Sequence, residues 1–353
     1  MKTVVTICSA NYLANAKVLG QSVKKHNPDC HFVIGLVDRL PKEIEPDYLR
    51  PFEVIAVEDL KIPDFQELVR KYNLIELNTL VKPFFLEYLY RRNPKVRTVM
   101  YLDPDIMVAG GFGGIEAELE RSSLIITPHG CTYDDSPSNM YFERSMLLTG
   151  IYNLGFIATA RSPVTDAFLS WWQERLRRFC FYLPKRGYFV DQNWVNLAPL
   201  YFEGVHIEKN PGCNMAYWNL FERTLSRKDG RYIVNDGHDL VFFHFSGYNP
   251  LQPDVISRRL HDLTFSERPD LRPLFDEYRD ALLACNFLNL KDLPCFFAPN
   301  EKPKGFGRLP VFIKRPIKGA LQKIFGALPN PLRRALCGIA QFTDENCRAN
   351  SAC

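Results

Sequence analysis

Apolar runs of strand length alternate with amphipathic stretches along the chain up to residue 250. Runs that are apolar nearly throughout occur at 3–9, 31–38, 52–59, 99–102, 123–130, 151–160 and 240–250. Between them, the segments 11–28, 75–93 and 164–179 place apolar residues at helical spacing, and Pro83 is expected to break or kink the second segment. Strands without polar alternation are typical of a sheet that helices cover on both faces. The pattern therefore predicts an α/β fold with a mostly parallel sheet flanked by helices.

The later segments extend this pattern toward the C-terminus. A shorter helix is expected at 189–202, and a strand followed by a polar, aromatic loop is expected at 204–220. The segment 251–300 is expected to be helical and peripheral. This pattern divides the chain into a main domain at 1–265, a peripheral helical segment at 266–300 and a basic, amphipathic tail at 301–353.

Two carboxylates follow the apolar strand at 99–102. Pro104 lies between Asp103 and Asp105 and cannot donate to a sheet ladder, so the strand is expected to end there. Ligands of open α/β sheets bind at this edge. Residues two apart point the same way, about 6–7 Å apart along a strand, and two like charges at that spacing repel unless a cation separates them. Oxygen ligands favour Mg²⁺ or Mn²⁺, although Asp-Pro after a strand is also common turn chemistry.

Three further polar residues stand where a nucleotide would need them. Tyr12 follows the first strand by one turn and is a candidate to cover a base ring, although simple packing is the commoner role. Asp38 closes the second strand and is a candidate to accept hydrogen bonds from a ribose or a base. Lys82 lies among apolar residues on a helix, which suits a phosphate contact better than a fully solvated side chain.

A second group of polar residues interrupts apolar surroundings in the later part of the chain. Asn153 lies inside an apolar strand, where a buried amide needs a partner. Asp191 and Gln192 are adjacent near the start of the predicted helix, so Asp191 is either a functional carboxylate or a helix cap. His244 lies between two phenylalanines near the end of a strand and is either a satisfied core residue or a metal ligand. Gly247 would let the backbone approach a phosphate closely.

The charge of the chain is unevenly distributed. The chain has 353 residues and a net charge of +4, but the segment 302–334 holds nine basic residues and no acidic one. The remainder is therefore acidic overall. Within the tail, 308–336 interleaves Lys and Arg with Phe, Ile and Leu, which suits an interfacial segment on anionic lipid. A disordered basic tail or a helix packed on the domain remains the alternative.

The cysteines and the apolar runs indicate the compartment. Ten cysteines at irregular spacing form no C-x-x-C pair, which argues against a zinc site or a disulfide framework. No signal peptide is recognised at the start, and no apolar run reaches the roughly 18–20 residues of a membrane span. We therefore expect a cytoplasmic protein, peripheral at the inner face of the cell membrane through its tail.

Taken in order, these motifs resemble the nucleotide-sugar glycosyltransferases of the GT-A fold, especially family eight and related bacterial enzymes. The resemblance extends over residues 3–250 and rests on an ordered set of motifs at 7–22, 79–89, 101–108, 152–158, 189–194, 211–220 and 244–248. It implies a Rossmann-like, nucleotide-binding half at 1–108 and an acceptor half at 109–265.

The resemblance also implies roles for individual residues. Asp103 and Asp105 match the metal motif, with Asp105 the more direct ligand, and His244 matches a third metal ligand. Lys82 stands where related enzymes often carry a basic residue near the phosphates. The other candidates for contacts with the nucleotide diphosphate are Tyr12, Asp38, Asp103 and Gly247. Asn153, Asp191 and Gln192 match residues that line the donor sugar and the reaction centre. The expected cofactor is Mn²⁺, or Mg²⁺ in its place.

The expected function is metal-dependent transfer of a sugar from a nucleotide diphosphate sugar, usually UDP-linked, to a hydroxyl acceptor. A cell-surface glycan or glycolipid is the expected acceptor, and no nucleic acid partner is expected. Two alternatives remain open. A phosphatase of the haloacid-dehalogenase type also uses Asp-x-Asp after an apolar strand, usually the first, and a non-catalytic sugar-binding protein would keep the fold without needing the whole polar set.

Overall fold

The computed structural model describes residues 1–298, apart from 43, 46, 261 and 262. The segment 301–353, for which the sequence predicts an amphipathic tail, lies outside the described residues. Within the described part, we find no helix with the length and apolar character needed to cross a bilayer.

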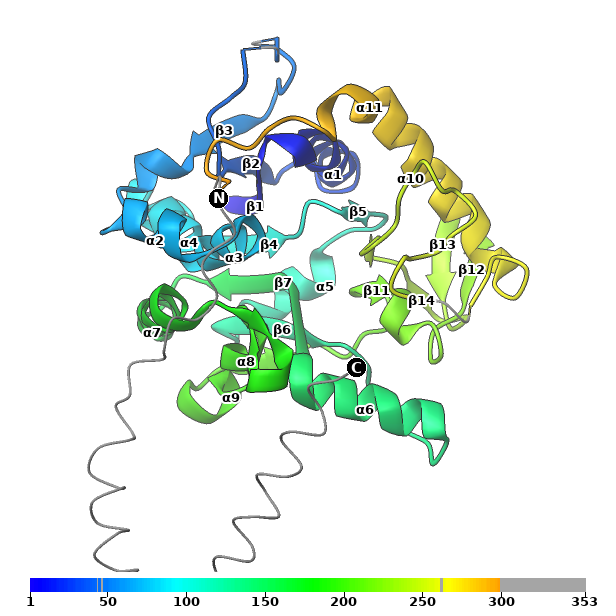
Figure 1. Ribbon diagram of the computed structural model, residues 1–353. Helices are drawn as coiled ribbons and strands as arrows, with labels where there is room; N and C mark the ends of the chain where they lie inside the picture. The colour runs from blue at the N-terminus through cyan, green and yellow to red at the C-terminus, as the bar shows by residue number, and fades with distance from the viewer. Residues whose placement is uncertain (43, 46, 261–262, 299–353) are drawn as a thin grey trace, which may run out of the picture. The chain divides into compact units, whose positions relative to one another are not determined.

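A seven-stranded sheet with the order β10-β6-β7-β4-β1-β2-β3 forms the centre of the described chain (Figure 1). Its strands are β1 (Lys2–Cys8), β2 (His31–Leu36), β3 (Glu53–Ala56), β4 (Thr98–Leu102), β6 (Leu124–Pro128), β7 (Tyr152–Ala160) and β10 (Val205–Ile207). Strand β7 runs antiparallel to β4 and β6, and the other neighbours in the sheet are parallel. The predicted mostly parallel sheet is therefore confirmed.

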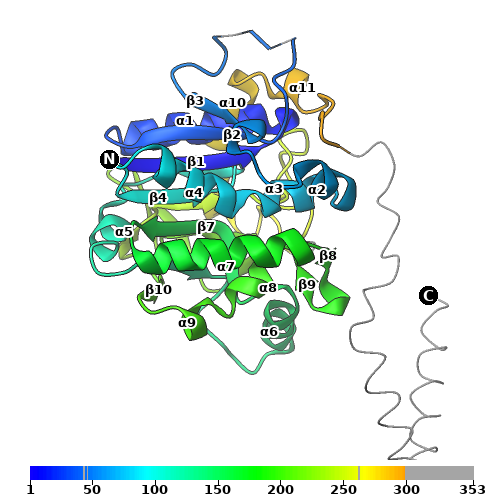
Figure 2. The same ribbon diagram turned by 90° about the vertical axis from the view of Figure 1, so that its left-hand side faces the viewer.

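Helices cover both faces of this sheet, as Figure 2 shows for α4 and α7 on one of them. The helices are α1 (Leu13–His26), α2 (Phe65–Lys71), α3 (Leu74–Leu80), α4 (Lys82–Arg92), α5 (Gly113–Glu118), α6 (Pro137–Thr149), α7 (Pro163–Phe179), α8 (Gln192–Val195), α9 (Ala198–Tyr201), α10 (Arg272–Ala284) and α11 (Phe287–Leu290). Short 3₁₀ turns occur at Ala10–Tyr12, Val57–Leu60, Pro184–Arg186, Tyr217–Asn219 and Pro269–Leu271. Side chains alternate between the faces, so Val4 packs in the core with α1 and α10, whereas Val5 packs with α4 and α7.

The helix expected at 75–93 is divided near Pro83, as the sequence predicts. Asn73 and Glu76 cap the start of α3 reciprocally, each side chain accepting the backbone N–H of the other residue at 3.0 Å. Pro83 lies in the first turn of α4, where a missing N–H leaves no hydrogen bond unmade.

The single helix expected at 189–202 is instead two short helices, and Pro199 in the first turn of α9 accounts for the interruption.

Smaller sheets complete the described chain. Strands β5 (Ile106–Val108), β11 (Met215–Ala216) and β15 (Phe242–His244) form one sheet in the order β11-β15-β5. A second sheet has the order β12-β13-β14, formed by β12 (Leu225–Lys228), β13 (Arg231–Val234) and β14 (His238–Asp239). A third sheet pairs β8 (Tyr182–Leu183) with β9 (Tyr188–Phe189). The first of these sheets matters for function, because the antiparallel register of β15 with β5 pairs His244 with Ile106.

Candidate active site

Asp103, Asp105 and His244 converge where β4 ends. The Phe245 N–H donates to the Asp105 carbonyl at 2.8 Å, which continues the register of β15 with β5 into the turn. His244 Nε2 lies 3.1 Å from Asp105 Oδ1 and 3.8 Å from Asp103 Oδ2. One ligand atom from each of the three residues lies within 4.8 Å of the others. The structure thus brings together the three residues that the sequence indicates as metal ligands.

The donor set of this cluster fits a divalent cation. Two carboxylates and one imidazole suit Mn²⁺ or Mg²⁺, and Nε2 is the ring atom that faces the carboxylates. The other ring atom, Nδ1, is buried and has no hydrogen-bond partner among the described residues. The ring is accommodated by Gly155, where a Cβ atom would lie 2.4 Å from His244 Cε1. Burial lowers the pKa of His244, but Asp105 and Asp103 outweigh burial and raise it on balance.

Replacing His244 by Ala tests whether this imidazole binds metal. Because the folded-state pKa of His244 is raised, its pairing with the carboxylates stabilises the metal-free protein below pH about 6.5 and is lost as pH rises through the raised pKa. Metal binding needs the neutral ring, so Mn²⁺ affinity should rise over that same range. In the variant, Mn²⁺ titrations between about pH 5 and pH 9 should give a lower Mn²⁺ affinity that depends less on pH. The ratio of the affinities for Mn²⁺ and Mg²⁺ should also be smaller than in the wild type.

The control for this experiment is His238→Ala, at an exposed position in β14. It should leave the metal titration and its pH dependence unchanged. A core role for His244 gives the opposite pattern, in which the Ala variant loses thermal stability while its metal titration overlays that of the wild type.

Lys82 and Asp191 form a buried ion pair beside the cluster. Lys82 Nζ lies 3.0 Å from Asp191 Oδ2 and 3.5 Å from Asp103 Oδ1, and it donates to the Leu154 carbonyl at 2.9 Å. Burial raises the pKa of Asp191, and the ammonium group of Lys82 opposes that rise. Asp191 precedes α8 without any side-chain capping bond, so the alternative reading of this residue as a helix cap is wrong. The charge of Lys82, expected to serve a phosphate, is paired within the protein.

Asn153 and Gln192 are locked together next to this ion pair. Because β7 is antiparallel to β4, its beginning lies at the sheet edge where β4 ends, which positions Asn153 there. Asn153 Nδ2 donates to Gln192 Oε1 at 3.1 Å, while its Oδ1 accepts from the Gly155 N–H at 3.1 Å and from Asn214 Nδ2 at 3.0 Å. Gln192 Nε2 donates to the Thr149 carbonyl at 2.9 Å. Both amides are therefore held in one orientation.

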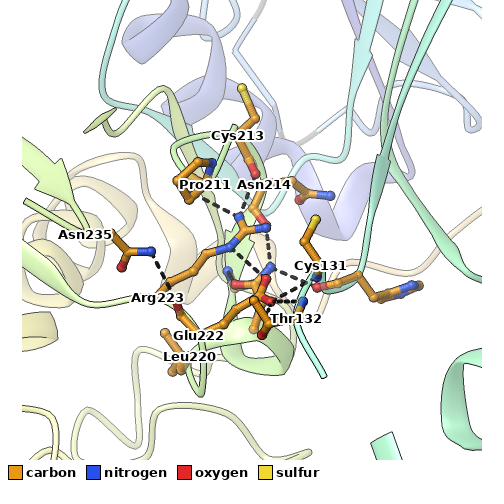
Figure 3. A network of polar contacts seen from close by, with 12 residues as sticks. Cys131, Thr132, Pro211, Cys213, Asn214, Leu220, Glu222, Arg223 and Asn235 are labelled. Carbon is orange, nitrogen blue, oxygen red and sulfur yellow. Dashed lines mark hydrogen bonds and ion pairs between the residues drawn. The ribbon is translucent and has the colours of Figure 1, made fainter. Parts of the chain in front are cut away.

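The loop that brings Asn214 to this network is anchored by a buried ion pair (Figure 3). Arg223 is 2% exposed, and its Nη1 donates to two backbone carbonyls of 211–213 at 2.9 and 2.8 Å. Its Nε lies 3.4 Å from Glu222 Oε1. The other carboxylate oxygen, Glu222 Oε2, accepts from the backbone N–H groups of 131–132 at 2.9 and 2.8 Å. This pair ties the Asn214 loop to the segment that follows β6.

A cleft of about 340 Å³ opens beside the carboxylates and is large enough for part of a nucleotide. Tyr12 lies at its rim with 40% of its surface exposed, which suits the predicted contact with a base. The lining residues are Ile7, Cys8, Ser9, Asn11, Tyr12, Leu74, Ile75, Asn78, Thr79, Lys82, Tyr101, Asp103, Pro104 and Asp105. The cleft thus connects the predicted metal site to the predicted base position.

Asp38 does not line this cleft. It is 1% exposed, and its carboxylate accepts three backbone N–H groups, from Ala10 at 3.0 Å, Arg39 at 2.9 Å and Phe296 at 2.7 Å. The structure gives Asp38 a role in holding the loop after β1 and the chain near residue 296. Its predicted contact with a nucleotide stays a prediction.

Gly247 lies on the turn that follows His244 and has the positive φ of +77° that favours glycine. A Cβ atom there would lie 2.5 Å from Ser257 Oγ. The turn therefore needs glycine for both its conformation and its packing, and the predicted approach to a phosphate stays a prediction.

Several residues of the site are not among the candidates that the sequence indicates. The Tyr101 hydroxyl donates to Asp103 Oδ1, and the period of two along β4 could have indicated that shared face. Gly155 is an isolated glycine in an apolar strand, a pattern that indicates the close approach of another group. The Trp218 ring lies between His129 and His244, with centroids 5.3 and 5.1 Å away, and burial lowers the pKa of His129 to about 4. Asn214 and Trp218 belong to the motif at 211–220 that supports the resemblance, but the sequence assigns no role to either.

Comparisons with known proteins give distant relatives. No family model matches the chain. Uncharacterized protein YfnF of Bacillus subtilis (strain 168) is 26% identical over 273 residues, covering 77% of this chain and 89% of YfnF. Uncharacterized protein YfnD of the same organism is 26% identical over 249 residues, covering 69% of this chain and 76% of YfnD.

The solved structures that are similar to this chain include two glycosyltransferases, LgtC and GlyE. The galactosyltransferase LgtC in complex with donor and acceptor sugar analogs is 17% identical, with a TM-score of 0.44, and covers 83% of this chain and 97% of LgtC. The glycosyltransferase GlyE of Streptococcus pneumoniae TIGR4 is 14% identical, with a TM-score of 0.44, and covers 84% of this chain and 65% of GlyE. At these identities, the donor, metal and acceptor of this chain have to follow from its own residues.

Proposed function

We propose that this chain is a metal-dependent glycosyltransferase that moves a sugar from a nucleotide diphosphate sugar to a hydroxyl of a glycan or glycolipid. The observation that carries this proposal is the convergence of two carboxylates and one imidazole, with ligand atoms within 4.8 Å of one another, beside a cleft of about 340 Å³. The UDP linkage of the donor follows from the sequence resemblance.

The chain's residues divide the reaction between them. Asp103, Asp105 and His244 would hold the divalent cation, whose positive charge offsets the charge that grows on the leaving diphosphate. As the bond from the sugar C1 to the phosphate oxygen breaks, the acceptor oxygen bonds to C1 and its proton is released. Asn153 holds Gln192 in one orientation, and Gln192 Nε2 keeps a second N–H that suits a sugar hydroxyl. The buried Lys82–Asp191 pair supplies fixed charges close to the transferred group.

Product analysis separates this proposal from its alternatives. The chain is incubated with UDP-linked sugars and Mn²⁺, and the released phosphorus compounds are identified. A glycosyltransferase releases UDP, including slow release with water as acceptor, and chelation of the metal stops it. Release of inorganic phosphate would favour the phosphatase, and binding without release would favour a sugar-binding protein.

We further propose that the segment 301–353 binds anionic lipid and holds a cytoplasmic enzyme at the inner face of the cell membrane. Its support is the interleaving of basic and apolar residues at 308–336. The full chain should co-sediment with anionic vesicles in low salt, and removal of 301–353 should abolish that binding while leaving UDP release intact. Equal sedimentation of the two proteins would contradict the proposal.

A further inference from the structure

The divalent cation of the candidate site does not neutralise a donor diphosphate completely. A divalent cation is balanced by the carboxylates of Asp103 and Asp105. The buried Lys82–Asp191 pair is neutral as a unit, so Lys82 brings no surplus charge. The two phosphates of a nucleotide diphosphate sugar carry two negative charges, and a further charge develops when the sugar departs. Phosphate oxygens with this charge need donors or cations from another part of the chain.

Two consecutive arginines lie at the turn that follows His244. The stems of Arg258 and Arg259 pack over Gly247, where a Cβ atom would lie 3.4 and 3.3 Å from their respective Cγ atoms. The backbone fixes this position, because the Arg258 N–H donates to the Gly247 carbonyl at 3.1 Å. Ser257 Oγ donates to the Ser246 carbonyl at 2.8 Å and accepts the Arg259 N–H at 3.2 Å. Both arginines are therefore attached to the turn beside the metal ligand.

The guanidinium groups lie close enough to the cleft to act on Tyr12, which lines it. Burial and Asp105 raise the pKa of Tyr12, whereas Arg258 and Arg259 oppose that rise. Both arginines are exposed, and neither forms an ion pair with a carboxylate of the described chain. Two exposed cations thus lie on the turn that follows His244, close enough to Tyr12 to oppose the rise in its pKa.

We propose that Arg258 and Arg259 bind the diphosphate of the donor, with Gly247 allowing the backbone to approach the same phosphates. The assignment rests on the proposed function and adds the residues that neutralise the leaving group. When the bond between C1 and the phosphate oxygen breaks, its electron pair stays on that oxygen, and the two guanidinium groups are positioned to stabilise it. Arginine suits this role because its planar donors bind phosphate oxygens in pairs.

Nucleotide binding measured by calorimetry in Mn²⁺ tests the assignment without an identified acceptor. The probes are UDP, UMP and inorganic pyrophosphate, because pyrophosphate contains the diphosphate without base or sugar. The variants are Arg258→Gln, Arg259→Gln and the double variant. The control is Arg97→Gln, which removes the same charge from an exposed position just before β4, at the opposite end of the strand from Asp103.

The double variant should bind UDP and pyrophosphate at least about tenfold more weakly than the wild type, with a smaller loss for UMP, so that the preference for UDP over UMP shrinks. Its binding should also depend less on salt, and its melting temperature should match that of Arg97→Gln. An unchanged preference for UDP over UMP in the double variant would overturn the assignment and leave the proposed function intact. If the wild type binds neither UDP nor pyrophosphate with Mn²⁺, both proposals fail.

Discussion

Replacing Asp105 by Asn is expected to lower the turnover of a nucleotide sugar by at least about a hundredfold. The change removes one negative charge from the predicted metal shell and alters the side-chain volume little. Asp105 Oδ1 lies 3.1 Å from His244 Nε2, so the amide also weakens the electrostatic coupling between two predicted ligands. Metal-stimulated release of UDP at saturating UDP-sugar gives the rate, and a Mn²⁺ titration shows how much activity returns at high metal concentration.

Asp229→Asn is the matched control, because it makes the same chemical change in the turn between β12 and β13. Asp229 has a φ of +51°, a conformation that Asn also adopts readily, so this variant should fold and turn over like the wild type. Near-normal turnover by Asp105→Asn at ordinary Mn²⁺ concentrations would remove Asp105 from the metal shell.

Breaking the Lys82–Asp191 pair should damage both catalysis and stability. Asp191→Asn leaves Lys82 near Asp103, at 3.5 Å, so its cost in unfolding free energy should be about 2 kcal/mol. Lys82→Met leaves the buried Asp191 carboxylate without its nearest cation and should cost about 3–5 kcal/mol. Both variants should lose at least about a hundredfold in turnover, since the fixed charges near the transferred sugar are gone. UDP affinity should change little in Asp191→Asn, because Asp191 is assigned to the sugar.

The measurements are chemical unfolding, turnover and calorimetry with UDP. Asp254→Asn is the control, because Asp254 pairs with Arg272 at the surface and its loss should cost less than about 1 kcal/mol. The double variant Lys82→Met with Asp191→Leu removes both charges and should be more stable than Lys82→Met alone, yet remain inactive. Recovery of turnover in the double variant, or a large loss of UDP binding in Asp191→Asn, would show that the pair is structural.

Local rules in the sequence are sufficient to place two of the three predicted metal ligands at one edge of the sheet. The proline between Asp103 and Asp105 ends a buried strand, and parallel strands place their carboxyl ends at one edge. His244 joins them through a pairing of β15 with β5 over more than a hundred residues, which no local pattern encodes. The residues alone leave the role of His244 open, and only the resemblance to known enzymes indicates a metal ligand.

Other parts of the site depend on tertiary contacts that spacing along the chain cannot reveal. Lys82 is a lone cation in the sequence, and only the packing of α4 against the loop before α8 makes Asp191 its partner. Asp38 has the position of a ribose ligand, but its oxygens are engaged by three backbone groups from two distant segments. Arg258 and Arg259 lie outside any recognisable motif, and their relation to Gly247 follows from the fold of the turn.

Pulsed electron paramagnetic resonance of Mn²⁺ bound to the chain with UDP tests the central claim most directly, because it detects nuclei close to the metal. We expect couplings to ³¹P from the diphosphate and to ¹⁴N from His244 in the wild type, with the ¹⁴N coupling absent in His244→Ala and the ³¹P coupling retained. Mn²⁺ that binds the wild type without a ³¹P coupling, or whose ¹⁴N coupling persists in His244→Ala, would contradict a site in which Asp103, Asp105 and His244 hold the metal against a nucleotide diphosphate.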